Sequence, residues 1–142
     1  MRLENLNLEG GFHYSHGSIE NKGTITEIKN CKFHRNSAYN AGAVLNVGVI
    51  NTIRDSIFDS NVISFKGNAG AISNEGTIDT ISGCRFEKNA AAAYGGGVLN
   101  GGKINEAFGT TLLRHGAKNG GGGQVADFSW GARGSRGCRP GG

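Results

Sequence analysis

The chain is poor in the features on which several common protein classes depend. Its 142 residues include one proline, Pro140, and three cysteines, and its longest uninterrupted apolar stretch is Ala90–Tyr94. That stretch is far short of the ~20 apolar residues that a membrane-spanning helix needs. The lone proline and the lack of a Gly-x-y period exclude collagen. The first residues carry acidic side chains where a secretory leader has its apolar centre, so we expect no leader.

Glycine, in contrast, is abundant, with 26 residues, and it interrupts every window in which apolar residues would keep a helical period. We therefore expect no long helices. Charge is divided unevenly along the chain. Residues 1–108 hold 10 basic and 10 acidic side chains, whereas residues 109–142 hold 5 basic and 1 acidic. The net charge of +4 thus belongs to the C-terminal segment, and we expect no nucleic-acid partner.

The central part of the chain is a repeat of 25 to 28 residues. One phrase, Ile-x-x-Ile-x-x-Cys/Ser-x-Phe-x-x-Asn, begins at Ile25, Ile50 and Ile78. A second phrase, in which a small residue precedes an aliphatic residue, any residue and Asn, ends at Asn21, Asn46, Asn74 and Asn100. A weaker copy of the second phrase ends at Asp127. A period in this range indicates a solenoid.

The spacing inside the unit favours one kind of solenoid. Cys31 and Phe33 are two residues apart, which places them on one face of a strand. Ile25 and Ile28 are three residues apart, so both point inward only if the chain turns a corner between them. Short strands joined by corners, closing after about 25 residues, describe one coil of a parallel β-helix. We predict an all-β fold of four to five such coils.

Stacked coils place like residues on like. We therefore expect three inward ladders, formed by Ile25, Ile50, Ile78 and Ile104, by Phe33, Phe58 and Phe86, and by Val44, Ile72 and Val98. Asparagines at a corner can bond backbone groups that a turn leaves unpaired, which is the role we expect for Asn36, Asn61 and Asn89. Glycine permits a positive φ, and we expect this at the corner residues Gly23, Gly48, Gly76 and Gly102.

The repeat divides the chain into three segments. Residues 1–16 are predicted to be an irregular half-coil or cap, residues 17–127 the β-helix with a weak last coil, and residues 128–142 an irregular Gly/Arg-rich tail. A parallel solenoid has unpaired strand edges at both ends and needs caps. Since neither terminus offers an obvious apolar lid, we expect fraying or end-to-end self-association.

The repeat resembles a known family. Phe-x-x-Asn followed by Gly-Gly-Ala-Ile or a close variant is similar to the repeats of polymorphic outer-membrane proteins and related autotransporter passengers. Here the pair is Phe33–Asn36 with Ala41–Val44, Phe58–Asn61 with Ala69–Ile72, and Phe86–Asn89 with Gly96–Val98. The resemblance, over residues 17–108, implies a right-handed β-helix that is secreted or displayed on the cell surface as an adhesin. The chain has too few coils for a complete member, so we expect a fragment.

One outward column carries groups that could do chemistry. His34, Asp59 and Glu87 occupy equivalent positions beside the inward phenylalanines, flanked by Arg35 and Lys88. Paired carboxylates can act as general acid and base, as in β-helix lyases and glycosidases, and with a histidine they can bind a metal. The alternative is a solvated strand face stabilised by cross-strand charge pairs. We favour the second interpretation and expect neither a metal nor a cofactor.

A second candidate is a row of aromatic residues. The loop after Phe-x-x-Asn varies in length between repeats and carries Tyr39, Phe65 and Tyr94, all on one edge of the solenoid. Length variation confined to one face often marks the binding face of a repeat protein, and aligned aromatic rings could stack on sugars or anchor a protein. The same rings could instead cover a corner of the core.

The remaining reactive side chains indicate no site. Cys31 and Cys84 share one ladder position two coils apart, which is too far for a disulfide, and we expect buried, inert thiols. His13 and His16 lie in what we interpret as a loop. Taken together, these patterns predict a non-enzymatic adhesin-like module that binds a protein or glycan on another cell or matrix. The alternative is a carbohydrate-active β-helix enzyme.

Overall fold

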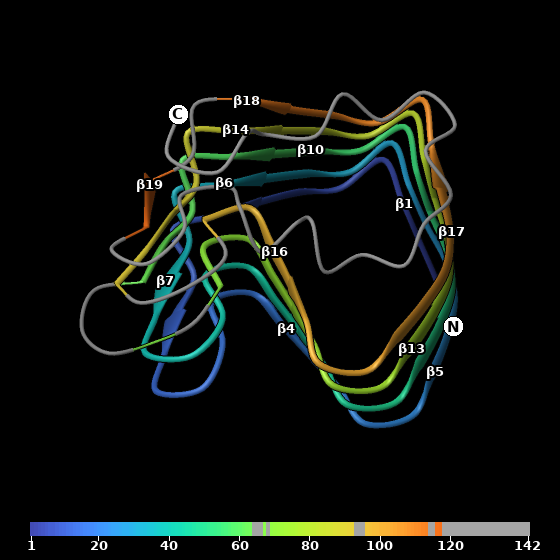
Figure 1. Ribbon diagram of the computed structural model, residues 1–142, viewed down its shortest axis with the longest axis horizontal. Helices are drawn as coiled ribbons and strands as arrows, with labels where there is room; N and C mark the ends of the chain where they lie inside the picture. The colour runs from blue at the N-terminus through green and yellow to red at the C-terminus, as the bar shows by residue number, and fades with distance from the viewer. Residues whose placement is uncertain (64–66, 68, 93–95, 114–115, 118–142) are drawn as a thin grey trace.

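The chain forms a parallel β-solenoid, seen along its axis in Figure 1. The computed structural model describes residues 1–63, 67, 69–92, 96–113 and 116–117. These residues form 19 strands and contain no helix. The chain runs anticlockwise in Figure 1, from the blue coils behind to the orange coil in front, so the solenoid is right-handed. Right-handed connections are the rule for parallel strands in one sheet.

Each coil contributes one strand to each side of the solenoid. The first sheet contains β1 (Arg2–Glu4), β5 (Thr24–Lys29), β9 (Val49–Arg54), β13 (Thr77–Ser82) and β17 (Lys103–Phe108). The second sheet contains β2 (Asn7–Glu9), β6 (Lys32–His34), β10 (Ile57–Asp59), β14 (Arg85–Glu87) and β18 (Thr111–Leu113). Successive strands within each sheet are parallel and one repeat apart.

Two further sheets complete the coil. The third sheet contains β3 (Phe12–His13), β7 (Ser37–Ala38), β11 (Val62–Ile63), β15 (Ala90–Ala91) and β19 (Gly116–Ala117). The fourth sheet contains β4 (Ile19–Asn21), β8 (Val44–Asn46), β12 (Ile72–Asn74) and β16 (Val98–Asn100). The described residues therefore form four complete coils and three strands of a fifth, which confirms the predicted fold.

The N-terminal segment is more regular than the predicted half-coil or cap. Strands β1, β2 and β3 pair in register with β5, β6 and β7 of the following coil. Leu3 and Leu8 take the ladder positions of Ile28 and Phe33. The repeat thus begins at Arg2, although the phrases that define it are not recognisable there. Residues 118–142, which include the predicted weak coil and tail, lie outside the described part.

The core consists of the predicted ladders. Every member of the isoleucine, phenylalanine and Val/Ile ladders is buried. The rings of Phe33, Phe58 and Phe86 stack with centroids 4.6 Å apart and planes within 3° of parallel. This separation follows from the spacing between neighbouring strands, about 4.8 Å, so each ring packs on the one in the next coil.

The three-residue step between inward isoleucines lies within one strand rather than between two. Ile25 and Ile28 both belong to β5, and both are buried. The ladder between β5 and β9 pairs Ile25 with Ile50 and Glu27 with Thr52, and it skips Thr26. The strand therefore bends at Thr26, its third residue. Because of this bend, Ile25 and Ile28 both point inward, although residues three apart in an extended strand point to opposite faces.

A column of buried asparagines runs along the corner between the second and third sheets. Asn36, Asn61 and Asn89 are fully buried. The side chain of Asn61 accepts hydrogen bonds at Oδ1 from the backbone and the amide of Asn36, at 3.1 and 3.0 Å. Its Nδ2 donates to the Phe33 carbonyl at 3.1 Å and to Asn89 Oδ1 at 2.9 Å. The corner role predicted for these asparagines is confirmed, and the amides also bond to one another.

A second asparagine column runs along the corner between the fourth and first sheets. Asn21 donates to Asn46 Oδ1 at 2.8 Å, Asn46 to Asn74 at 2.8 Å, and Asn74 to Asn100 at 2.7 Å. The same amides donate to the backbone carbonyls of Val49, Thr77 and Lys103. Since a buried amide without a partner costs free energy, each asparagine depends on the coil beside it.

The glycines Gly23, Gly48, Gly76 and Gly102 do not have the positive φ predicted for them. They are required for space instead. A Cβ on Gly48, Gly76 or Gly102 would overlap the carbonyl oxygen of the equivalent glycine in the preceding coil. Gly23, which has no preceding equivalent, would meet nothing within 4 Å. The backbones of successive coils approach so closely at this turn that a side chain does not fit.

Positive φ occurs at two other corners. The residues between the first and second sheets are Asn5, Asn30, Asp55, Gly83 and Gly109, with φ between 50° and 60°. Those between the second and third sheets are Gly10, Arg35, Ser60 and Lys88, with φ between 51° and 68°. Glycine, asparagine and aspartate tolerate this conformation well. The other three residues adopt it because the flanking ladders fix the corner on both sides.

The asparagine column predicts a large effect of Asn61→Ala. The change removes an acceptor from two buried donors of Asn36 and a donor from the Phe33 carbonyl. We expect it to lower the free energy of unfolding by about 3 kcal/mol, measured by urea denaturation. The exposed Asn7 on β2 provides the control, since Asn7→Ala removes an amide from the surface. Equal effects of the two changes would contradict the structural role of the column.

The glycine turn predicts opposite outcomes for two equivalent substitutions. Gly76→Ala forces the new methyl group against the backbone of Gly48 and Val47, and we expect a loss of about 2 kcal/mol or more. Gly23→Ala meets no neighbour and should leave stability unchanged or raise it slightly, since alanine restricts the unfolded chain. Thermal unfolding followed by circular dichroism compares the two. A similar loss for both would mean that backbone conformation, not space, requires glycine.

Candidate functional site

The predicted column of His34, Asp59 and Glu87 lies on the outer face of the second sheet. Strand pairing places the three residues in register on β6, β10 and β14, with Glu9 of β2 extending the column. His34 Nδ1 lies 2.9 Å from Asp59 Oδ2, in a contact that lacks hydrogen-bond geometry and is an ion pair only when the imidazole is protonated. The structure therefore brings the candidate residues together as neighbours on adjacent strands.

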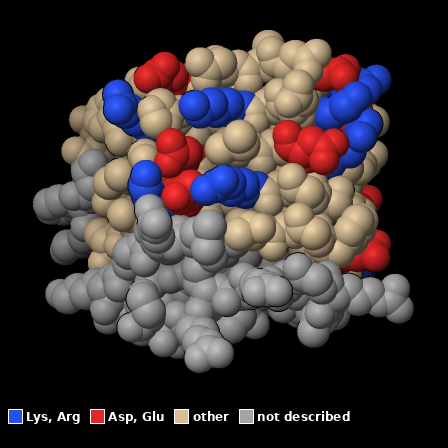
Figure 2. Space-filling view, turned by 90° about the horizontal axis from the view of Figure 1, so that it is seen from above, with Lys and Arg blue, Asp and Glu red and all other residues tan. Residues whose placement is uncertain are grey.

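Other partners also engage these carboxylates. Asp59 accepts a hydrogen bond from Ser60 Oγ at 2.9 Å, and Glu87 forms an ion pair with Arg85 at 2.7 Å. Figure 2 looks down on this side of the solenoid and shows basic and acidic side chains interleaved over it. Among the described residues, no group of three His, Cys, Asp or Glu side chains could hold a metal ion. The column thus has a cross-strand contact between His34 and Asp59 and an ion pair within β14 between Arg85 and Glu87, while Asp59 and Glu87 are neighbours of like charge.

The predicted aromatic row is only partly described. Phe65 and Tyr94 lie outside the described residues. Tyr39, which follows β7, is 39% exposed, and two rings from the first coil pack against it. The ring of Tyr14 stacks on Tyr39 with centroids 5.3 Å apart and planes 14° apart, and Phe12 meets Tyr39 edge-on at 6.2 Å. Tyr14 is 75% exposed and Phe12 63%. Three rings thus form an exposed cluster.

The cluster continues into two histidines. His13 meets Tyr14 edge-on at 6.4 Å and stacks on His16 at 4.6 Å. We refer to these five residues, Phe12, His13, Tyr14, His16 and Tyr39, as the ring strip. At its end His16 Nε2 lies 3.6 Å from Glu20, which also pairs with Lys22 at 3.1 Å. Partial burial, together with the neighbouring His13, lowers the pKa of His16, so its imidazole is neutral at pH 7.

Four members of the ring strip were not identified as site residues from the sequence. The sequence predicts a loop at His13 and His16 and an aromatic row that begins at Tyr39, whereas His13 lies in β3. The sequence does contain a signal for Tyr14. It lies 25 residues before Tyr39, and the same separation of 25 residues joins the equivalent asparagines Asn21 and Asn46. The pairing of His13 with Ala38 places Tyr14 and Tyr39 at equivalent positions. This equivalence is hard to recognise in the sequence because the first coil lacks the first of the two phrases that define the repeat.

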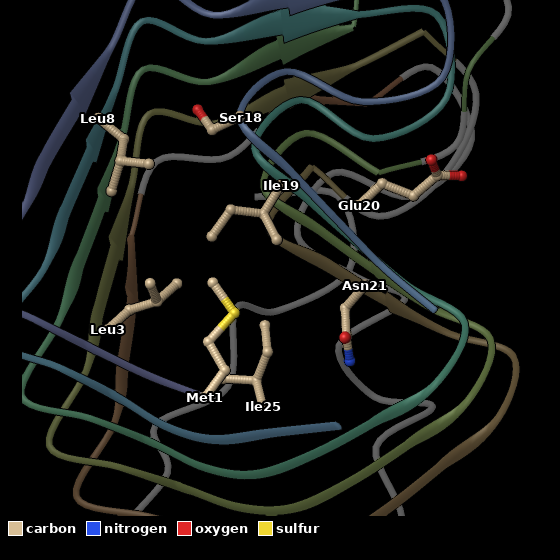
Figure 3. Close-up of a pocket in the computed structure, with 8 residues that line it drawn as sticks. All are labelled: Met1, Leu3, Leu8, Ser18, Ile19, Glu20, Asn21 and Ile25. Carbon is tan, nitrogen blue, oxygen red and sulfur yellow. The ribbon is translucent and has the colours of Figure 1, made fainter. Parts of the chain in front are cut away.

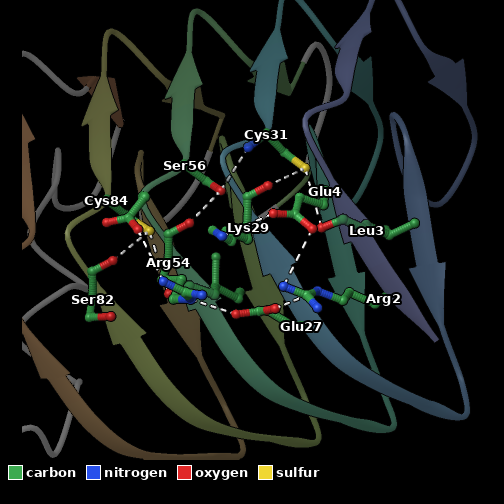
Figure 4. A network of polar contacts seen from close by, with 12 residues as sticks. Arg2, Leu3, Glu4, Glu27, Lys29, Cys31, Arg54, Ser56, Ser82 and Cys84 are labelled. Atoms are coloured by element: carbon green, nitrogen blue, oxygen red, sulfur yellow. Dashed lines mark hydrogen bonds and ion pairs between the residues drawn. The ribbon is translucent and has the colours of Figure 1, made fainter.

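An ion-pair network connects the first three coils on the outer face of the first sheet, as Figure 4 shows. Glu27 on β5 lies between Arg2 on β1, at 2.7 Å, and Arg54 on β9. Lys29 pairs with Glu4 at 2.9 Å. The hydrogen bond from Arg54, and then the charge of Arg2, lowers the pKa of Glu27, and the hydrogen bond from Lys29 lowers that of Glu4. Both carboxylates therefore stabilise the fold in their ionised form.

The two described cysteines are part of the core. Cys31 and Cys84 are buried and unpaired, with Ser56 at the ladder position between them, as predicted. The Cys31 thiol donates to the Lys29 carbonyl at 3.3 Å, and Cys84 to that of Ser82 at 3.4 Å. Burial raises the pKa of Cys84 to about 12. Because the thiolate is the reactive form, Cys84 is unsuited to act as a nucleophile.

The open end of the first coil contains a hollow of about 300 Å³, shown in Figure 3. Its lining residues are Met1, Leu3, Leu8, Ser18, Ile19, Glu20, Asn21 and Ile25. Leu3, Leu8 and Ile19 are only partly buried, because no coil covers them on this side. The predicted end-to-end self-association would occur at such an edge, and it stays a prediction.

Comparison with known proteins gives no family for this chain. No protein-family model, no curated protein and no solved structure matches it. In the part of the chain that the structure describes, no helix is long and apolar enough to cross a membrane.

The ion-pair network predicts a specific dependence of stability on pH. Because the folded-state pKa of Glu27 is lowered, its contribution is complete above the unfolded pKa and is lost as the pH falls through the folded-state pKa. Glu27→Gln should lower the unfolding temperature at pH 7 by a few degrees and reduce the further loss on acidification. Thermal melts of the two proteins at pH 7 and at about pH 3 measure both effects.

Glu75→Gln serves as the matched control, since Glu75 is exposed and forms no ion pair with another described residue. This variant should retain the acid dependence of the unsubstituted protein. If Glu27→Gln behaves like Glu75→Gln at both pH values, the network does not contribute to stability.

Proposed function

We propose that this chain is a non-enzymatic repeat module, displayed on a cell surface or secreted, that binds a ligand on another cell or matrix. The observation that carries this proposal is the exposed cluster of Phe12, Tyr14 and Tyr39. Large aromatic side chains are enriched where proteins bind partners, and a contiguous exposed group of them needs an explanation. The adhesin-like role that the repeat's resemblance implies agrees with this surface.

The scaffold supports a binding role in a second way. Phe12 lies on β3, which pairs with β7 just before Tyr39, and next to it the Gly11 amide donates to Asn36 of the buried asparagine column at 2.9 Å. A ligand would therefore meet rings that are already positioned, and it would lose little free energy in ordering them. The candidate catalytic carboxylates have a different environment. Glu87 pairs with Arg85 on its own strand and Asp59 accepts a hydrogen bond from Ser60, and these contacts favour a structural role.

The test is an adhesion assay with the full chain immobilised on beads. We expect saturable binding to cultured animal cells or to an immobilised extracellular matrix. The double change Phe12→Ala/Tyr14→Ala should weaken binding at least about tenfold. The matched control is Ile57→Ala, which removes an exposed apolar side chain from β10 on another face and should leave binding unchanged.

Two results would overturn the proposal. The first is the absence of binding to every cell and matrix surface tested. The second is cleavage of a polysaccharide by the unsubstituted chain, measured as release of reducing ends or unsaturated sugars, with loss of that activity in Asp59→Ala. This second result would establish the alternative of a carbohydrate-active enzyme with Asp59, Glu87 and His34 at its site.

A further inference from the structure

The ring strip combines two kinds of chemistry on one exposed corner. Its aromatic half, Phe12, Tyr39 and Tyr14, presents apolar ring surface in a connected series. Its polar half begins at His13, where the rings give way to groups that can form hydrogen bonds. All of these side chains except Tyr39 come from β3 and the residue that follows it, so they belong to one short stretch of chain.

The polar half offers both donors and acceptors. His13 Nδ1 accepts a hydrogen bond from the backbone of Ser15 at 3.2 Å, so the neutral ring carries its proton on Nε2 as a donor. Glu20 provides carboxylate oxygens that accept hydrogen bonds, and Lys22, whose side chain is 71% exposed, provides a donor. Glu20 connects the two ends of this polar group, since its carboxylate lies 3.6 Å from His16 Nε2 and 3.1 Å from Lys22 Nζ.

This combination matches the surface of a sugar ring. A pyranose has an apolar face of C–H groups, which packs on an aromatic ring, and a rim of hydroxyl groups, each of which donates and accepts hydrogen bonds. Ligand sites in proteins typically pair aromatic surface with a few placed polar groups. Phe12 and Tyr14 each contact Tyr39, so the three rings form one continuous apolar surface that suits several linked sugars rather than one.

The charges favour a neutral sugar. The carboxylate of Glu20 pairs with Lys22 at 3.1 Å, so the two charges offset each other. His16, in its neutral form, adds no positive charge. A sulfated or carboxylated glycan would need several basic side chains, which the strip does not provide.

We propose that the ring strip, together with the neighbouring Glu20 and Lys22, binds a neutral polysaccharide chain, with sugars packed on the exposed surfaces of the Tyr14, Tyr39 and Phe12 rings and hydroxyl groups bonded to His13, Glu20 and Lys22. The inference rests on the proposed binding function and names its ligand. A protein ligand is the main competing occupant. Stable protein interfaces bury about 800 Å² on each partner, and three rings at one corner are a small part of such an area.

The experiment is isothermal titration calorimetry of the full chain with cellohexaose, laminarihexaose, xylohexaose and chitohexaose, and with a heparin hexasaccharide. We expect binding to at least one neutral hexasaccharide and none to heparin. Tyr14→Ala should weaken it at least about tenfold, whereas Tyr14→Phe, which keeps the ring, should change it by no more than about twofold. Because Tyr14 is 75% exposed, both variants should fold, which circular dichroism checks.

Phe108→Ala is the matched control, since Phe108 is an aromatic residue of similar exposure to Tyr39, 41% against 39%, on the first sheet. It should bind as the unsubstituted chain does. Absence of binding to all neutral hexasaccharides, binding to heparin alone, or binding that Tyr14→Ala leaves unchanged would each overturn the inference. If beads adhere to cells through Phe12 and Tyr14 while no hexasaccharide binds, the binding function stands and its ligand is a protein.

Discussion

The parallel pairing of each coil with the next is the constraint on which the rest of the structure depends. It places equivalent residues one strand spacing apart along four sheets, so any side chain must be compatible with its own copies above and below. Phenylalanine meets this condition by stacking, as Phe33, Phe58 and Phe86 do. Asparagine meets it because one amide both donates and accepts. Glycine meets it at the turn where Gly48 and Gly76 approach too closely for a side chain.

The same constraint acts differently on the outside. Strand pairing places some like charges side by side, such as Asp59 and Glu87, and nearby groups of opposite sign offset their repulsion, as Arg85 does for Glu87. Glu27 lies between Arg2 and Arg54, and Asp59 lies beside His34. Chemically active side chains on these faces are thus engaged by their neighbours. The corner after β3 and β7 is the exception, since its rings lie at the surface and extend away from the sheets.

The first coil has both paired sheets and the exposed corner with its aromatic rings. Its strands pair on one side, its leucines are partly exposed, and it carries Phe12, Tyr14 and the two histidines. The first coil thus keeps the pairing of the later coils although its sequence departs from the repeat, and its surface is unlike theirs. A binding role at this corner would use side chains that the core does not need.

The sequence by itself determined the period, the solenoid and the members of the three apolar ladders, because side chains that must match across every coil leave a regular pattern. It also placed Asn61 at a corner and Cys84 in the core. It did not determine why Gly76 is glycine, since close approach of two backbones and a positive φ require the same residue. Nor did it show that Arg2 begins the repeat or that Tyr14 and His13 join Tyr39. Those contacts depend on which coils lie side by side, and only the tertiary structure decided them.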